Sequence, residues 1–154
     1  EAGATDPLMD ELEALKDQAA RQEEKYLRLA AEYDNFRKRT AKEKEAIWND
    51  AKADAALAFL PVYDNLERAL KQETADEAYK KGVEMTMNQL KTVLEKLGIT
   101  EIEALGQPFD PTLHNAVMHI EDENFGENTV AEVFQAGFRL GDKVVRFAMV
   151  KVAN

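Results

Sequence analysis

Apolar residues recur at heptad spacing through the first part of the chain. The steps of three and four residues are typical of a helix with one apolar stripe, as in a coiled coil. Neither glycine nor proline interrupts residues 8–60, so the pattern predicts one long helix that ends near Leu60. At ~1.5 Å per residue this helix would be roughly 80 Å long. The stripe comprises Leu8, Leu12, Leu15, Ala19, Tyr26, Leu29, Tyr33 and Phe36.

The stripe lacks sufficient cover within its own chain, and it is weak. The remaining residues could cover only part of so long a helix, which favours a parallel homodimer, with a helix folded back on its own chain as the alternative. Ala19, Gln22 and Thr40 bury little apolar surface. Beyond Phe36 an 11-residue spacing relaxes the supercoil. A seam of this kind should melt early, which would allow regulation by temperature.

Two shorter amphipathic segments follow the long helix. Because proline is favoured in the first helical turn, the pattern predicts a helix from Pro61 to about Leu70. After the polar stretch 71–76, a third helix is expected from about Asp76 to Leu97, closed by Gly98. Two such helices from each chain of a dimer would form a four-helix bundle. The residues expected at the dimer interface are Leu12, Leu15, Tyr26, Leu29, Tyr33, Phe36, Leu66 and Leu90.

Gly82 lies inside the expected third helix, where glycine is destabilising by ~1 kcal/mol relative to alanine. Two interpretations remain open. It is either a weak spot without a role, or a place where another backbone or a partner comes close.

The last third of the chain has the alternation and the turn residues of short strands. Gly141-Asp142 is expected to form a hairpin turn, and residues 123–128 a loop. The expected strands are Ile99–Leu105, Val117–Ile120, Thr129–Gln135, Phe138–Leu140 and Val144–Val152. The sequence therefore predicts an α+β protein with a coiled-coil helix at 1–60, short helices of a dimeric four-helix bundle at 61–98 and a small all-β domain at 99–154.

Charge and cysteine content narrow the function classes. The 154 residues include 30 acidic and 20 basic side chains, a net charge of −10, and acidic residues are in excess in every part of the chain. This balance argues against binding to nucleic acid or to an anionic membrane surface. The absence of cysteine favours a reducing, cytoplasmic location. No apolar run approaches the roughly 18 residues that span a bilayer, and no secretory signal peptide is recognisable.

The stretch FDPTLHNAV, residues 109–117, brings together residue types that could bind a metal. Asp110, His114 and the nearby His119 are the candidate ligands of a metal enzyme. However, no HExxH spacing, phosphate-binding loop or serine occurs in the chain. The simpler interpretation is that Asp110 caps the turn begun by Pro111 and that His114 faces back on it. We therefore expect no catalytic residue, cofactor or metal.

Four separated stretches together resemble the GrpE family, the nucleotide exchange factors of DnaK-type heat-shock chaperones. They are EYDNFRKRTAKE at 32–43, LPVYDNLERAL at 60–70, FDPTLHNAV at 109–117 and GFRLGDKVVRFAMVKV at 137–152. Phe147 departs from the family, whose members often carry proline or alanine there. The resemblance implies a homodimer with a long paired helix, a four-helix bundle and two β domains. One β domain would open the chaperone's nucleotide-binding domain so that ADP leaves, and the factor itself would bind no nucleotide.

The resemblance also implies which residues contact the chaperone. They are Lys143, Phe134, Leu140, Arg146, Arg37, Arg68 and the surface around Gly82. Most of them have a structural alternative: Lys143 could be a solvated turn residue, Arg68 could pair with Asp64 in its own helix, and the two apolar residues could belong to the core. Arg37 opens a basic cluster at 37–44 that could equally be a solvated helix face.

The implied biological role is support of protein folding in the heat-shock and stress response. In the family, the long helix is thought to loosen on heating, as a thermosensor, and to reach toward the chaperone's substrate-binding region. The alternative function is a structural coiled-coil scaffold whose β domain docks on an unrelated partner.

Overall fold

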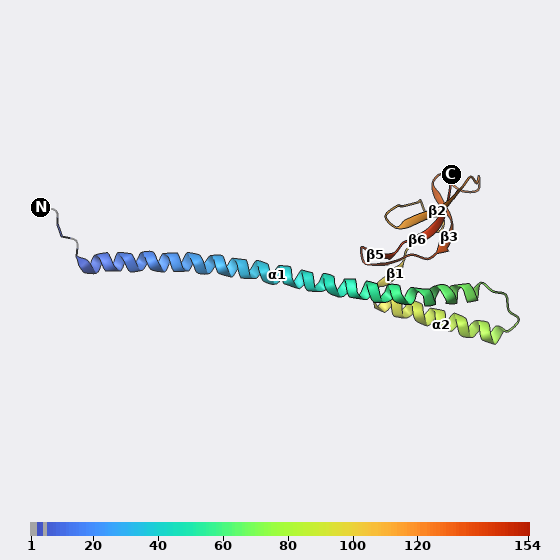
Figure 1. The fold of residues 1–154 in the computed structure, drawn as a ribbon, viewed down its shortest axis with the longest axis horizontal. Coiled ribbons are helices and arrows are strands. Elements are labelled where there is room, and N and C mark those ends of the chain that lie inside the picture. The colour runs from blue at the N-terminus through green and yellow to red at the C-terminus, as the bar shows by residue number, and fades with distance from the viewer. Residues whose placement is uncertain (1–2, 5) are drawn as a thin grey trace. The chain divides into compact units, whose positions relative to one another are not determined.

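The computed structural model describes residues 3–4 and 6–154, and within them two helices precede six strands (Figure 1). The elements are α1 (Pro7–Leu70), α2 (Glu77–Lys96), β1 (Ile99–Glu101), β2 (His114–Ile120), β3 (Thr129–Gln135), β4 (Phe138–Leu140), β5 (Lys143–Arg146) and β6 (Ala148–Ala153). The predicted α+β class is confirmed. Residues 1, 2 and 5 of the predicted coiled-coil segment lie outside the described residues. The chain divides into two units, residues 1–47 and 48–154.

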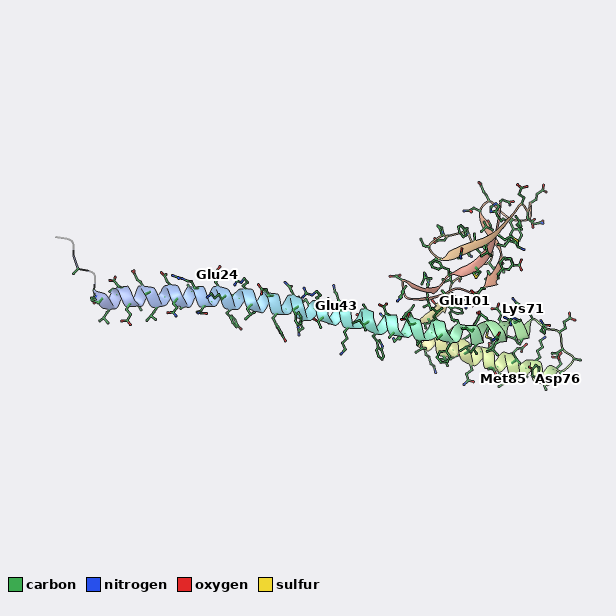
Figure 2. The ribbon with its side chains drawn as sticks, viewed as in Figure 1. Glu24, Glu43, Lys71, Asp76, Met85 and Glu101 are labelled. Carbon is green, nitrogen blue, oxygen red and sulfur yellow. The ribbon has the colours of Figure 1, made fainter. Side chains whose placement is uncertain are left out.

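The first unit consists mainly of the N-terminal part of α1. Asp6 caps the helix by accepting a hydrogen bond from the Leu8 backbone N–H at 3.1 Å, and Pro7 occupies the first helical position. Figure 2 shows the side chains around Glu24 and Glu43 extending freely from the ribbon. The six predicted seam residues of this region are between 43% and 69% exposed. The apolar stripe is thus uncovered within its own chain, and the homodimer stays a prediction.

The predicted helix boundary at Leu60 is wrong, because α1 continues through Pro61 to Leu70. A proline inside a helix removes one backbone hydrogen bond and costs ~3 kcal/mol. Packing outweighs this cost here. Leu60 and Tyr63, on either side of the proline, are almost fully buried, at 1% and 2% exposure, while Pro61 itself is exposed. The carbonyl that loses its partner, that of exposed Leu57, can therefore bind water.

Helix α2 has the predicted bounds to within a residue. Asp76 is its N-cap and accepts a hydrogen bond from the Tyr79 backbone N–H at 3.0 Å. Gly98 follows the helix with φ of +81°, a conformation that favours glycine at this position. Met87 and Leu94 of α2 share a buried core with the part of α1 around Leu60, so the two helices lie side by side (Figure 1).

The six strands form two three-stranded sheets with different cores. The inner sheet has the antiparallel order β1-β4-β5, and its Ile99 and Phe138 belong to the same core as the helices. The outer sheet has the order β2-β6-β3, in which β2 is parallel and β3 antiparallel to β6. Its core is separate and contains Val130, Val150 and Val152. The 99–154 segment therefore contains one layer fused to the helices and one layer with a core of its own.

The predicted continuous strand Val144–Val152 is wrong, since the chain leaves the inner sheet after Arg146 and enters the outer sheet at Ala148. Ala148 is fully buried in the outer core, and its N–H donates to the Leu113 carbonyl at 3.1 Å. Phe147, between the two strands, is half exposed at 47%. A strand that bends from one sheet to the next lets a single β-rich segment serve both layers.

Of the other four predicted strands, two have the predicted bounds and two have different bounds. Thr129–Gln135 and Phe138–Leu140 are confirmed, as is the hairpin turn, in which Gly141 has φ of +57°. β1 is shorter than predicted and ends at Glu101, while β2 begins at His114 rather than at Val117.

Candidate functional site

Arg146 joins the β strands to α1 through a two-pronged ion pair with Asp64. Its Nη1 and Nη2 atoms each lie 2.8 Å from one carboxylate oxygen of Asp64. Its Nε and Nη2 atoms also donate to the Ala136 carbonyl, at 3.0 and 2.7 Å. The side chains of Arg146 and Asp64 are only 14% and 22% exposed. Paired geometry and burial make this the strongest type of charge-assisted contact. The hydrogen bonds of Arg146 described above are thus made within its own chain. Its contact with a chaperone stays a prediction.

Lys143 stands at the hairpin between β4 and β5 and is accessible. Its ammonium group pairs with the Asp50 carboxylate on α1, and the two side chains are 43% and 61% exposed. Exposed ion pairs contribute little to stability, typically ~0–1 kcal/mol. A partner that offers a better acceptor could therefore take the lysine from Asp50 at small cost.

The two apolar residues predicted near Lys143 differ in their surroundings. Leu140 is partly buried and packs against the core of the helices and inner sheet, as the structural alternative proposed. Phe134 is 43% exposed on the outer sheet, and the Lys151 ammonium lies 5.4 Å from the centre of its ring. Lys151 also pairs with Glu132 at 2.6 Å. An aromatic ring held flat under a cation is a surface feature rather than a core one.

The basic cluster that begins at Arg37 is largely paired within its own helix. Arg37 and Lys38 lie 3.5 and 2.7 Å from the carboxylate of Asp34, and Arg39 lies 3.8 Å from that of Glu43. The hydrogen bond and charge of Lys38 hold the pKa of the Asp34 carboxyl below its usual value. These contacts fit the solvated helix face, although the positive groups stay exposed and open to a partner.

The alternative that Arg68 pairs with Asp64 in its own helix is wrong, because the partner of Asp64 is Arg146. The Arg68 side chain lines a small cleft of about 210 Å³ between the end of α1 and β3. Phe134 and Lys71 line the same cleft. Two of the predicted contact residues, Arg68 and Phe134, are thus brought together across 66 positions of sequence.

Gly82 lies exposed on α2, and a Cβ atom built on it would meet nothing within 4 Å. The Thr86 hydroxyl donates to the Gly82 carbonyl at 2.9 Å. Close approach by the chain's own backbone is therefore not the reason for this glycine. Approach by a partner stays a prediction.

Replacing Gly82 by alanine should stabilise the isolated protein. The substitution removes the backbone entropy cost of a mid-helix glycine, about 1 kcal/mol, and meets no steric obstacle. Thermal unfolding followed by circular dichroism would measure the change. A destabilised Gly82→Ala variant would indicate that another chain packs directly on this position.

Asp110 and His114 form the predicted capped turn. The backbone N–H and hydroxyl of Thr112 donate to the Asp110 carboxylate at 2.9 and 2.7 Å, and these bonds lower the pKa of Asp110. His114 is buried, and its Nδ1 accepts from the Asp110 N–H at 3.1 Å while its Nε2 lies 3.2 Å from the Glu103 carbonyl. Because both ring nitrogens bind backbone groups, this histidine is structural. Among residues 3–4 and 6–154, no cluster of three or more metal-ligating side chains occurs.

Sequence reasoning missed the two acidic partners on α1, Asp50 and Asp64. Both face basic residues of β5 that follow at least 82 positions later in the chain. Asp64 is half-buried and directly follows buried Tyr63 in the structure, but no signal in a single sequence shows which basic residue lies opposite it. In the part of the chain that the structure describes, no helix is sufficiently long and apolar to cross a membrane.

Taken together, the fold and the site define a helical and β-sheet protein that offers binding surfaces: an uncovered apolar stripe on α1 and a β module braced on the helices. Comparison with known proteins gives the family. The family model described as GrpE matches residues 2–154. The chain belongs to the GrpE family, whose members are nucleotide exchange cochaperones of DnaK.

Individual relatives are similar over most of this chain. Protein GrpE of Clostridium acetobutylicum is 58% identical over 144 residues, covering 94% of this chain and 68% of the relative. Protein GrpE of Clostridium beijerinckii is 57% identical over 131 residues, which cover 85% and 63%. Protein GrpE of Bacillus velezensis is 46% identical over 147 residues, which cover 94% and 75%. The matched region thus spans between 63% and 75% of these relatives.

Proposed function

We propose that this chain is a cytoplasmic cochaperone that acts as a homodimer and accelerates the release of ADP from a DnaK-type chaperone. The observation that carries the proposal is the match of the GrpE family model to residues 2–154, helices and both sheets included. The proposed mode of action is binding, which requires no catalytic group, cofactor or metal in this chain.

The proposed mechanism is a population shift in the chaperone. A factor that binds the open nucleotide-binding domain more tightly than the ADP-closed one favours the open state. Linkage then requires reciprocity: the cochaperone weakens ADP binding to the chaperone to the same extent as ADP weakens binding of the cochaperone. To act in this way, the β module must contact the chaperone through a rigid surface, and the ion pair of Arg146 with Asp64 supports such rigidity.

The proposed chaperone surface includes the hairpin and parts of both helices. Lys143 is its central cation, with Phe134 and Arg68 beside the small cleft at the end of α1. Arg37 and the exposed surface around Gly82 are further contacts, of which the former could reach toward the substrate-binding region of the chaperone.

The weak, uncovered seam of α1 supports a further proposal, that the helix pair loosens on heating and slows exchange during stress.

Replacing Lys143 by alanine should reduce the accelerated release of a labelled nucleotide from a DnaK-type chaperone by about tenfold. A charged hydrogen bond to a partner contributes roughly 1.5–3 kcal/mol, which exceeds the weak pair that the lysine leaves on its own chain. Fluorescence stopped-flow with labelled ADP would measure the rate. Circular dichroism should show an unchanged fold.

The matched control for this experiment is Asp50→Asn, which removes the same intrachain pair and keeps the lysine. We expect its release rate to equal or exceed that of the original protein. Equal losses for both variants would mean that Lys143 acts only within its own chain. If the unaltered protein dimerises but accelerates no release, the scaffold alternative is favoured.

A further inference from the structure

The outer sheet is connected to the rest of residues 48–154 by three chain segments. The inner sheet shares its core with α1 and α2, whereas the outer sheet has a separate core. The chain crosses between the sheets three times, at residues 102–113, at Ala136–Gly137 and at Phe147. A layer with its own core changes its angle as a unit unless contacts at its connections hold it in place.

Arg146 contacts two of these crossings at once. It directly precedes Phe147, and it donates two hydrogen bonds to the Ala136 carbonyl at the other crossing. Its remaining bonds reach the Asp64 carboxylate on α1. The Gln135 side-chain amide, at the end of β3 in the outer sheet, also donates to this carboxylate, at 3.3 Å. One carboxylate on the helix therefore holds residues of both sheets.

Open space lies beside Asp64 and Gln135 and, separately, beside the crossing at Ala136. One cleft, of about 680 Å³, is lined by Glu67 of α1 together with Val133 and Ala136. The other, of about 210 Å³, lies between the end of α1 and the Phe134–Gln135 segment. Where a cleft separates two elements, apolar packing does not set their angle. The orientation of the outer sheet should then depend strongly on the polar contacts of Asp64 with Arg146 and Gln135.

We propose that the ion pair of Asp64 with Arg146 is a positioning lock that fixes the orientation of the outer sheet relative to the C-terminal part of α1. If the chain has the proposed function, Asp64 is in addition a positioning residue for nucleotide exchange. A wedge opens a cleft only if it does not yield, because binding energy spent on turning the outer sheet is lost for opening the chaperone. Loss of the lock should therefore slow opening more than it weakens binding.

The lock itself can be tested without the chaperone. The chain contains no cysteine, so spin labels can be placed at His119→Cys on β2 and Ala69→Cys on α1, both exposed. Labelled chains diluted into excess unlabelled chains give one distance distribution per molecule. We expect Asp64→Asn, which is nearly isosteric, to broaden this distribution, and Asp54→Asn, an exposed aspartate on the same helix, to leave it unchanged. An unbroadened distribution for Asp64→Asn would overturn the lock, whatever the protein's function.

The second test separates opening from binding. For Asp64→Asn we expect the maximum rate of labelled ADP release to fall about tenfold, while the concentration giving half-maximal release changes less than about threefold. Arg146→Lys keeps the charge but loses the paired geometry, and should give an intermediate rate. A normal maximum rate with a broadened distance distribution would overturn the positioning role and leave the lock. No acceleration by the unaltered protein would contradict the proposed function, while the distance measurement still decides on the lock.

Discussion

Replacing Gly137 by alanine will destabilise the folded protein by about 3 kcal/mol, within the upper range for inserting atoms into a filled site. The added Cβ would lie 2.3 Å from the backbone nitrogen of Ala148 and 2.9 Å from its Cα. Real carbon atoms do not approach backbone so closely, and backbone cannot turn aside as a flexible side chain does. Glycine is needed here because two chain segments approach each other closely.

The surroundings of Gly137 leave little room for relaxation. Ala148 is fully buried and bonded to the Leu113 carbonyl, and the Gly137 carbonyl accepts from the Ile102 N–H at 2.8 Å. On the preceding residue, the Ala136 carbonyl is held by Arg146. Moving any of these segments breaks a buried hydrogen bond, which costs a further ~1–3 kcal/mol.

Chemical denaturation followed by circular dichroism would measure the Gly137→Ala effect, with Gly82→Ala as the matched control. Both variants make the same chemical change, but the site at Gly82 is open and helical. The two free energies of unfolding should therefore shift in opposite directions. A Gly137→Ala variant as stable as the original protein would show that the crossing between the sheets can widen freely.

Much of the helical part of the fold could be predicted from local sequence signals. The bounds of α2 follow from Asp76 at its start and Gly98 at its end, because capping depends on residues within one turn. Pro61 gave a wrong helix boundary, because it too is only a local signal. The local signal indicated a helix start, but the burial of Leu60 and Tyr63 against α2 and the inner sheet kept the helix continuous. Tertiary packing then outweighed local preference.

The β part was less predictable, since strand breaks depend on which sheet receives the chain. The segment VVRFAMVKV reads as one strand, and only the partners of Arg146 and Ala148 reveal that it serves two sheets. The candidate site shows the same division. Lys143 follows from a motif, whereas Asp50 and Asp64 could not be paired with their β5 partners, because contacts between residues so far apart in the chain leave no trace in one sequence.

Replacing Leu29 by glutamate should dissociate the proposed homodimer and reduce the helix content of the first unit. Leu29 is a seam position, and full burial of a leucine contributes about 1.5–3 kcal/mol per chain. The substitution loses this contribution twice in a dimer and places two carboxylates opposite each other in the seam. Because a long isolated helix gains most of its stability from packing of its apolar stripe, the helix should fray once its partner leaves.

Leu27→Glu is the matched control, and it makes this experiment decisive. Leu27 and Leu29 are 59% and 64% exposed in the single chain, so exposure alone predicts equal effects of the two substitutions. The heptad pattern instead places Leu27 off the seam, where glutamate is a good helix former and faces water. Sedimentation velocity and helical ellipticity should therefore change for Leu29→Glu and hardly for Leu27→Glu. Equal behaviour of the two variants would rule out the heptad seam as the dimer interface, and with it the proposed arrangement of the paired helices.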